Sequence, residues 1–227
     1  LIEEYDSHFS YEIKKTNKVK QLKLKATYNK KIVHEILDAG LVAYVAFSQD
    51  DGPVVVPMIY GRKNDTIFLH GARKARIIRL LEKTNRASLN VTLLDGIVFA
   101  RSTFNSSMNY RSVTIFGSPK IVTDNKKKLL AMKIIGEHTM PGRWSEVRDS
   151  HLNEIKMTGV IKLKIEDASA KISSGPIKDE DEDYKIPVWA GILPITTQTG
   201  SLQDDERLIN NAQPSEKIKR LQNKKIC

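Results

Sequence analysis

Cysteine is almost absent from the sequence, since the only one is Cys227, the last residue. A disulfide within the chain is therefore excluded, which suits a reducing compartment. Long hydrophobic runs are also absent, because the longest, Leu41 to Phe47, is far shorter than the roughly 20 residues of a membrane-spanning helix. The opening residues, LIEEYDSHFS, show neither a secretory signal nor an Arg-rich transit peptide. We therefore predict a cytoplasmic protein, with the nucleus as the alternative location and no membrane partner.

The short motifs of several enzyme classes are missing as well. The 5 histidines show no HExxH motif and no Cys/His ligand spacing, so no metal site is predicted. A GxSxG nucleophile elbow, a GxGxxG dinucleotide loop and a Walker phosphate loop are all absent. Glu137 and His138 could be an acid and a base, but their place at the end of a predicted helix favours a surface pair. No catalytic residue is predicted.

Positive charge is what the sequence has in excess. Lys and Arg number 37 against 27 for Asp and Glu, which gives a net charge of +10. Much of this charge is clustered at the two ends of the chain, and charge clusters at chain ends are usually solvated and mobile. The alternative is contact with a nucleic acid or an acidic partner, because clustered cations release counterions from phosphates. No recognition helix, zinc-finger spacing or aromatic stacking motif accompanies them. The clusters are Lys14, Lys15, Lys18, Lys20, Lys23 and Lys25 at one end and Lys217, Lys219, Arg220, Lys224 and Lys225 at the other.

The hydrophobic periodicity predicts a mainly β (α+β) protein. Helices are expected over 29–39, 75–82, 125–137 and 146–157, the third capped by Thr123 or Asp124. Strands are expected over 41–47, 53–60, 66–70, 89–94, 97–103, 110–122 and 160–165, with Asp95-Gly96 as a hairpin turn and a bend near Gly117. Only 75–82 could serve as a crossover helix, so the pattern favours a six- to seven-stranded Greek-key barrel with a few peripheral helices. We predict this domain over 28–196, after a polar basic lead-in (1–27) and before a polar basic C-terminal extension (197–227).

The stretch IFLHGARKARIIR, residues 67–79, joins an apolar strand to a basic helix. Gly71 lacks a Cβ, so a ligand or another backbone can come close. Arg73, Lys74 and Arg76 cluster at the helix start, where free N–H groups and the helix dipole favour an anion. The pattern predicts a phosphate at this corner. The alternative is an ordinary basic surface helix, with His70 as an unremarkable strand-end residue.

A second candidate is the segment ARSTFNSSMNYRSV, residues 100–113, in which an Arg-Ser pair stands on each side of a polar loop. Strand alternation sends Arg111 to one face and Ser112 to the other, so one of them is expected at an interior or an interface. A buried arginine needs an anionic partner, and phosphate is one candidate. The alternative is an exposed cross-strand ion pair.

Several segments together resemble one family. The matching segments are Leu69–Gly71 with Arg76, Thr92–Gly96, Ala100–Ser102, Ser107–Val113, Phe116–Gly117, Pro141–Trp144, Ser169–Lys171, Gly175–Pro176 and Pro187–Pro194. They are similar, in register from about residue 28 to 195, to the flavin-nucleotide-binding group of the pyridoxamine phosphate oxidase superfamily. The resemblance implies an FMN-binding split β-barrel that forms a homodimer, with two flavins in clefts between the subunits.

The same resemblance implies which residues hold the cofactor. Arg76 lies where the oxidase places a phosphate-binding lysine, and Arg111-Ser112 falls on an Arg-Gln pair of the strand that reaches the flavin. The backbone of the strand with Val56-Pro57-Met58 is expected to lie along the edge of the isoalloxazine ring. The implied site comprises Val56, Pro57, Met58, His70, Gly71, Ala72, Arg76, Arg101, Ser102, Met108, Asn109, Tyr110, Arg111, Ser112 and Trp189.

The sequence departs from the true oxidases after Pro194. There the oxidases carry an aromatic segment and an Arg-x-His-x-Arg-like stretch, whereas this chain has Ile-Thr-Thr-Gln-Thr-Gly-Ser, so vitamin B6 oxidation is not predicted. His70 also resembles the nitroimidazole-resistance branch, which is linked to nitro-group reduction. We predict an FMN-dependent oxidoreductase with an unknown small-molecule redox substrate. The alternatives are a flavin carrier or sensor without turnover and a nucleic-acid-binding protein that uses its basic ends; FAD, a deazaflavin or haem in place of FMN stays open.

Overall fold

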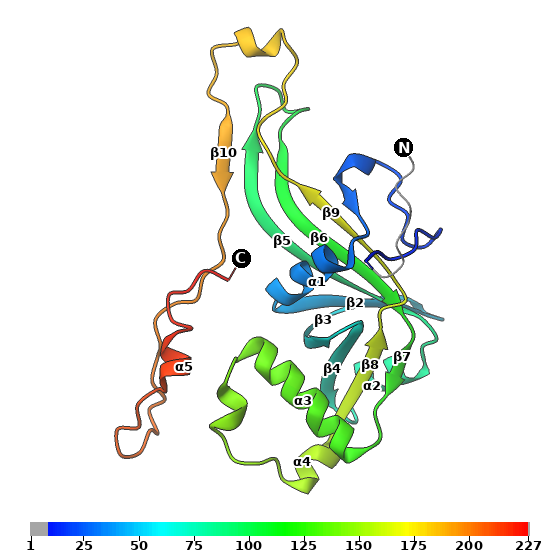
Figure 1. The fold of residues 1–227 in the computed structure, drawn as a ribbon, viewed down its shortest axis with the longest axis vertical. Coiled ribbons are helices and arrows are strands. Elements are labelled where there is room, and N and C mark those ends of the chain that lie inside the picture. Colours follow the sequence, from blue (N-terminus) through cyan, green and yellow to red (C-terminus); the bar gives the residue numbers. More distant parts are fainter. Residues whose placement is uncertain (1–8, 227) are drawn as a thin grey trace.

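The computed structural model describes residues 9–226, so Cys227 and the start of the lead-in lie outside the described residues. Within them the chain forms a mainly β (α+β) fold built on one antiparallel sheet (Figure 1). Along the sheet the strands run β1-β9-β6-β5-β2-β3-β4-β8-β7, and β10 pairs with β5. The strands are β1 (Ala26–Thr27), β2 (Val42–Gln49), β3 (Gly52–Lys63), β4 (Thr66–Ala72), β5 (Ala87–Phe99), β6 (Ser107–Gly117), β7 (Pro119–Ile121), β8 (Thr158–Lys164), β9 (Asp167–Ser173) and β10 (Gly191–Pro194).

The predicted class is confirmed, but the predicted strand number is wrong: residues 9–226 contain ten strands rather than six or seven. The strands β1, β7 and β10 have two to four residues, too few for a periodic pattern to show. The strand β9, Asp-Ala-Ser-Ala-Lys-Ile-Ser, is rich in small residues and lacks the usual β-branched run. The strand order is an open path, so among the described residues the predicted closed barrel is not formed by strand pairing.

The segment around Asp95-Gly96 is continuous strand, so the predicted hairpin turn at this point is wrong. Strand β5 passes through it with a shift of register between Leu94 and Gly96, and the chain turns later, between β5 and β6. Gly96 is needed here because a Cβ would lie 3.0 Å from Ile192 Cγ2 and 3.1 Å from the Leu193 carbonyl oxygen of β10. The glycine therefore admits a third strand beside β5 instead of closing a turn. The bend predicted near Gly117 is confirmed, since β6 ends there and β7 begins at Pro119.

Five α-helices surround the sheet in the described part of the chain. They are α1 (Lys30–Ala39), α2 (Arg76–Lys83), α3 (Asn125–Thr139), α4 (Leu152–Met157) and α5 (Glu216–Lys219), with 3-10 turns η1 (Lys23–Lys25), η2 (Arg143–Ser145) and η3 (Asp183–Lys185). The predicted caps are confirmed for α3, where the Asp124 carboxylate accepts from the Lys127 amide at 2.9 Å. The helix predicted over 146–157 is shorter than expected, because only Leu152–Met157 is helical.

The long helix α3 packs on the outer face of β3 and β4 (Figure 1). Gly61 makes this approach possible, because a Cβ on it would lie 2.7 Å from the Ile135 amide nitrogen and 2.8 Å from the Ile134 carbonyl. Atoms of a helix backbone cannot move aside as a side chain can. The position of α3, which forms one wall of both pockets described below, thus depends on one glycine of β3.

Replacing Gly61 with alanine is expected to lower the free energy of unfolding by about 1–3 kcal/mol, the usual effect of overpacking. Urea denaturation followed by circular dichroism measures it. Gly200→Ala is the matched control, because nothing lies within 4 Å of the point that its added methyl group would occupy, and its change should stay within about 0.5 kcal/mol. Equal stabilities for the two variants would contradict the packing described for α3.

The two ends of the chain differ in how they meet the sheet. Near the start, Lys14 Nζ donates to the buried Asp167 carboxylate at 2.8 Å, and Tyr11 is buried and donates to Asp65 at 2.7 Å. Lys14 therefore belongs to the fold and not to a mobile basic end. Beyond β10 the chain runs as an exposed arm that carries α5 (Figure 1). Among the described residues, no helix has the length and apolar content that crossing a membrane requires.

Candidate cofactor site

The outer face of β4 carries the first predicted site residue. Ile67 and Leu69 are buried in the main core, while Phe68 and His70 point to the opposite face, where α3 covers the sheet. Phe68 packs against a small second cluster that includes Val122. His70, two residues further on, faces a separate pocket.

The His70 pocket has a volume of about 390 Å³, within the usual range for small-molecule sites. Its walls are mostly apolar and come from β3, from α3 and from the turn that follows α3. Arg143 brings a cation to one side. The pocket is lined by Ile59, His70, Met132, Ile135, Gly136, Thr139, Met140, Arg143, Trp144 and Val147.

His70 itself is an unsatisfied polar group in this apolar setting. Its Nδ1 is buried and has no hydrogen-bond partner among the described residues. Burial lowers the pKa of the imidazole, so the ring is neutral at physiological pH. A neutral imidazole is a good ligand for a transition metal, and buried polar atoms without a partner in a native fold call for an explanation.

The corner between β4 and α2 is the second predicted site, and it is rigidly held. The Arg73 amide donates to the Met157 carbonyl at 2.7 Å, and the Ala75 amide donates to the Ala72 carbonyl at 2.8 Å. Gly71 serves packing here, since a Cβ on it would meet Ile78 Cγ1 of α2 at 3.3 Å. The loop thus sets the start of α2 firmly against the end of β4.

The start of α2 has the features of an anion site. Ala75 precedes the helix and cannot cap it with a side chain, so the first helical N–H groups lack a side-chain acceptor. Arg73 is paired with Glu82 at 3.0 Å, but no carboxylate among residues 9–226 pairs with Lys74 or Arg76. Free N–H groups and two unpaired cations at one helix end favour a phosphate.

The remaining predicted residues gather around the far end of the β5–β6 hairpin. Arg101 is held there by Asp179, with Nη1 to Oδ2 at 3.0 Å, and its guanidinium lies 4.8 Å from the centre of the Tyr184 ring. Its Nε is buried without a hydrogen-bond partner among the described residues. Trp189 lies against Phe99, with ring centres 5.8 Å apart. The acidic loop that contains Asp179 thus docks on this hairpin.

Arg111 forms the cross-strand ion pair that was the alternative to a phosphate contact. Its guanidinium meets the Asp95 carboxylate with two hydrogen bonds, Nη2 to Oδ1 at 2.6 Å and Nε to Oδ2 at 3.0 Å. Ser112 lies within hydrogen-bond distance of Thr92, with the hydroxyl oxygens 2.8 Å apart. A phosphate role for Arg111 stays a prediction.

The structure therefore brings the predicted residues together as two groups and not as one. His70, Gly71, Ala72 and Arg76 share the β4–α2 corner, with Val56, Pro57 and Met58 on β3 beside β4. Arg101, Ser102 and Trp189 lie with the start of β6, at the opposite end of the molecule's long axis (Figure 1). Met108, Asn109, Tyr110, Arg111 and Ser112 follow in β6 itself. Within one chain, the two groups do not form a single pocket.

The apolar wall of the His70 pocket was not predicted. Met132 occurs in a predicted helix and Trp144 in a matching family segment, but no pattern in them or in Met140 points to a ligand. Glu137 and His138, considered as an acid and a base, have structural contacts instead: Glu137 accepts from the Gly142 amide at 2.7 Å, and His138 Nε2 lies 2.7 Å from the Gly40 carbonyl oxygen. Trp144 packs close to α3 at Gly136, since a Cβ on this glycine would lie 3.3 Å from the Trp144 ring, and no sequence pattern predicts that contact.

Comparison with known proteins places these features in a family. Residues 29–172 match the family model described as pyridoxamine 5'-phosphate oxidase. The chain is similar to the flavocytochrome Anf3 from Azotobacter vinelandii, with 33% identity and a TM-score of 0.87 over 92% of this chain and 97% of that one. It is similar to the FAD and heme binding protein from Mycobacterium smegmatis, with 31% identity and a TM-score of 0.85 over 89% and 98% of the two chains. No curated protein matches the sequence.

A more distant structure shares the fold alone. It is a protein described as a 5-nitroimidazole antibiotic resistance protein from Bacteroides thetaiotaomicron, with 22% identity and a TM-score of 0.55. The match covers 65% of this chain and 86% of that one.

Proposed function

Because the chain belongs to the flavin-binding pyridoxamine 5'-phosphate oxidase family, as its sequence motifs predicted, we propose that it is a redox protein that holds both a flavin and a haem. The observation that carries the proposal is the buried Nδ1 of His70, which has no partner among the described residues and lies in an apolar pocket, next to the uncapped, basic start of α2. Two similar structures above 30% identity are a flavocytochrome and an FAD and heme binding protein.

The residues of the His70 pocket fit a haem. An apolar slot suits the porphyrin faces, and one histidine is a sufficient axial ligand. Met132, Met140 and Trp144 would contact the macrocycle, and Arg143 would pair with a propionate. The lowered pKa of His70 keeps the ring from being protonated, so its nitrogen lone pair is available at neutral pH.

The β4–α2 corner fits the phosphate of a flavin. The uncapped start of α2 supplies N–H donors, and Lys74 and Arg76 supply unpaired positive charge. FMN is the flavin that the sequence resemblance predicted, and FAD is the flavin of the similar mycobacterial protein. We propose FAD on the strength of that likeness, and the mass of the released flavin distinguishes the two.

The two cofactors supply complementary chemistry when bound, because a flavin accepts a hydride and a haem iron exchanges single electrons. The chain's own residues bind and orient them. The apolar side chains of α3 would exclude water from a ring held at His70, and the hydrogen-bonded β4–α2 loop would position the phosphate. No side chain near either site is proposed as an acid or a base, and vitamin B6 oxidation is not proposed.

We also propose that the protein is a homodimer. The outer face of the β2–β3 hairpin carries a continuous group of exposed apolar side chains, here called the apolar strip. Opposite residues of β2 and β3 share this face, as the pairs Tyr44 with Pro57 and Ala46 with Val55 illustrate. Tyr44 is 53% exposed and Val55 60% exposed, which is unusual for neighbouring large apolar residues. The strip comprises Val42, Tyr44, Ala46, Val55, Pro57 and Ile59.

A dimer through the apolar strip would also account for the two separated groups of predicted site residues. Ile59 belongs both to the strip and to the His70 pocket, so the pocket borders this face. A symmetric contact there would let the β5–β6 hairpin of one subunit complete the site at the β4–α2 corner of the other.

Replacing Arg76 with alanine is expected to weaken flavin binding by about 1.5–3 kcal/mol, the value of a charge-assisted hydrogen bond. That is roughly a 10- to 150-fold rise in Kd. Quenching of flavin fluorescence during titration measures it. Lys83→Ala is the matched control, since Lys83 is a basic residue at the other end of the same helix. An unchanged Kd in the Arg76 variant would remove the phosphate from this corner.

Titration of the cofactor-free protein with haem and with FAD, followed by absorbance, tests the function as a whole. The proposal predicts one haem and one flavin per chain, bound together. Reduction of the flavin by an added two-electron donor should then reduce the haem in the same molecule faster than free flavin reduces it. Binding of both cofactors without this transfer would favour the carrier or sensor that was the alternative in the sequence analysis.

A further inference from the structure

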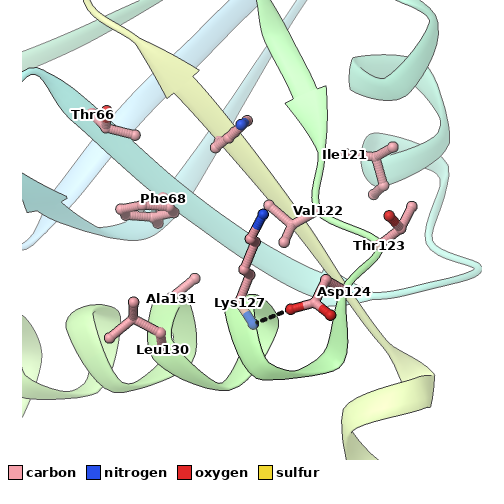
Figure 2. A pocket seen from close by; sticks show the side chains of 10 residues that line it. Thr66, Phe68, Ile121, Val122, Thr123, Asp124, Lys127, Leu130 and Ala131 are labelled. Carbon is pink, nitrogen blue, oxygen red and sulfur yellow. Dashed lines mark hydrogen bonds between the residues drawn. The ribbon is translucent and has the colours of Figure 1, made fainter.

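A second pocket lies on the outer face of β4, beside Phe68 instead of His70 (Figure 2). Its volume is about 510 Å³, and its floor is apolar. Phe68, Val122 and Ala131 meet there from β4, from the segment after β7 and from α3 (Figure 2). The pocket is lined by Thr66, Phe68, Ile121, Val122, Thr123, Asp124, Lys127, Leu130, Ala131 and Lys162.

Unpaired lysines surround this apolar floor. Lys120 of β7 and Lys162 of β8 are directly opposite each other in the antiparallel pair, so their side chains share one face. Lys127 of α3 lines the Phe68 pocket itself. Lys164, two residues after Lys162 on β8, lines an adjoining hollow, and both hollows have Thr66 and Lys162 in their walls. Within residues 9–226 none of these four lysines forms an ion pair, and each is exposed. Like charges placed opposite each other in a sheet destabilise it, so an anion between them would be favoured.

The carboxylates that face the two hollows are already used. Asp124 caps α3 by accepting from the Lys127 amide, as the dashed line in Figure 2 marks. Glu166 accepts from the Ser118 amide at 3.1 Å and pairs with Arg86 at 3.3 Å. Four lysines against these two acids leave the surface with excess positive charge beside an apolar cavity.

We propose that the Phe68 pocket binds a small amphipathic carboxylate. Its apolar chain or ring would lie against Phe68, Val122 and Leu130, and its carboxylate would lie between Lys162 and the neighbouring lysines Lys120 and Lys127. Binding would bury apolar surface of both the ligand and the pocket, which favours association. The carboxylate would reduce the electrostatic repulsion between the lysines. The site is distinct from the proposed cofactor pockets, since it shares no lining residue with the His70 pocket.

Isothermal titration of the full chain with decanoate, below its micelle concentration, tests the proposal. We expect saturable binding of one decanoate per chain, and binding of decanol that is at least about tenfold weaker, because it lacks the charge that the lysines recognise. Lys162→Gln should weaken decanoate binding about tenfold, because it removes one of the charges that contact the carboxylate. Lys133→Gln is the matched control, because Lys133 is an exposed lysine of α3 outside the pocket.

A second variant keeps the test decisive. Leu130 lines the pocket and is 50% exposed, so Leu130→Trp can fill the cavity without entering the core. It should abolish decanoate binding while leaving the circular dichroism spectrum unchanged. Failure of the wild type to bind decanoate, equal affinity for decanol, or equal effects of the Lys162 and Lys133 changes would overturn the proposal. Flavin and haem binding should be unchanged in Lys162→Gln, and decanoate should still bind to His70→Ala. The carboxylate site can therefore be refuted without refuting the proposed function, and the reverse.

Discussion

Replacement of His70 with alanine is expected to remove the haem from the protein and to leave the flavin bound. The imidazole is the one neutral nitrogen ligand that lines the apolar pocket, and its Nδ1 has no partner elsewhere in the described chain. Loss of a residue that only supports a metal ligand already lowers metal affinity by about 10- to 100-fold. Loss of the ligand itself should therefore lower the affinity for haem by at least about 100-fold. The absorbance of the purified variant, read together with the flavin content after release, measures both effects.

The His70 prediction has two controls. His151→Ala removes an exposed histidine that does not line the His70 pocket, so haem content should stay at the wild-type level. His70→Gly with added imidazole should regain haem, since the free ligand can occupy the space of the lost side chain. A His70→Ala protein that keeps its haem at full occupancy would assign the iron to another ligand.

Replacement of Tyr44 with glutamate is expected to convert a dimer into monomers. Tyr44 is at the centre of the apolar strip, and a symmetric interface would bury the new carboxylate twice. Burying even a neutral polar group without a partner costs at least about 2 kcal/mol, and a charge costs more, so the dimer Kd should rise at least about 100-fold. Light scattering coupled to size-exclusion chromatography measures the mass of each species.

The same variant should also lose flavin, if the partner's β5–β6 hairpin completes the site. Leu152→Glu is the matched control, because Leu152 is 55% exposed at the start of α4, where a glutamate favours the helix. That variant should keep the mass and flavin content of the wild type. A wild-type protein that is monomeric at micromolar concentration, or a Tyr44 variant that stays dimeric, would contradict the interface.

Local signals predicted much of the fold. Asp124 caps α3 as the sequence predicts, because an Asp side chain ahead of an apolar 3.6-residue repeat can accept from the first free N–H groups of the helix. Tertiary contacts decided the rest. Asp95-Gly96 has the local pattern of a turn, yet β10 from nearly a hundred residues later pairs beside it, and the strand continues through a shift of register. Strand β9 was missed because its pattern of small residues has meaning only once β6 lies next to it.

The sequence predicted where the residues of the candidate site lie better than what each of them contacts. His70, Gly71 and Arg76 do lie at one corner, because residues this close in sequence need no tertiary information to be neighbours. The pocket that gives His70 its chemistry is built by α3, more than sixty residues later, and no local pattern places that helix there. Gly71 shows the same limit, since it serves the approach of Ile78. Arg111 meets Asp95 across two strands, and only the register reveals that pair.

If one chain of this fold holds both a flavin and a haem, both cofactors should be present in the protein as purified. Absorbance of the freshly purified protein, with mass spectrometry of the molecules released on unfolding, would identify both. We expect the absorbance bands of a flavin and of a histidine-ligated haem, and the masses of FAD and haem in equal amounts. A protein that is colourless, and stays so after incubation with both cofactors, would contradict it.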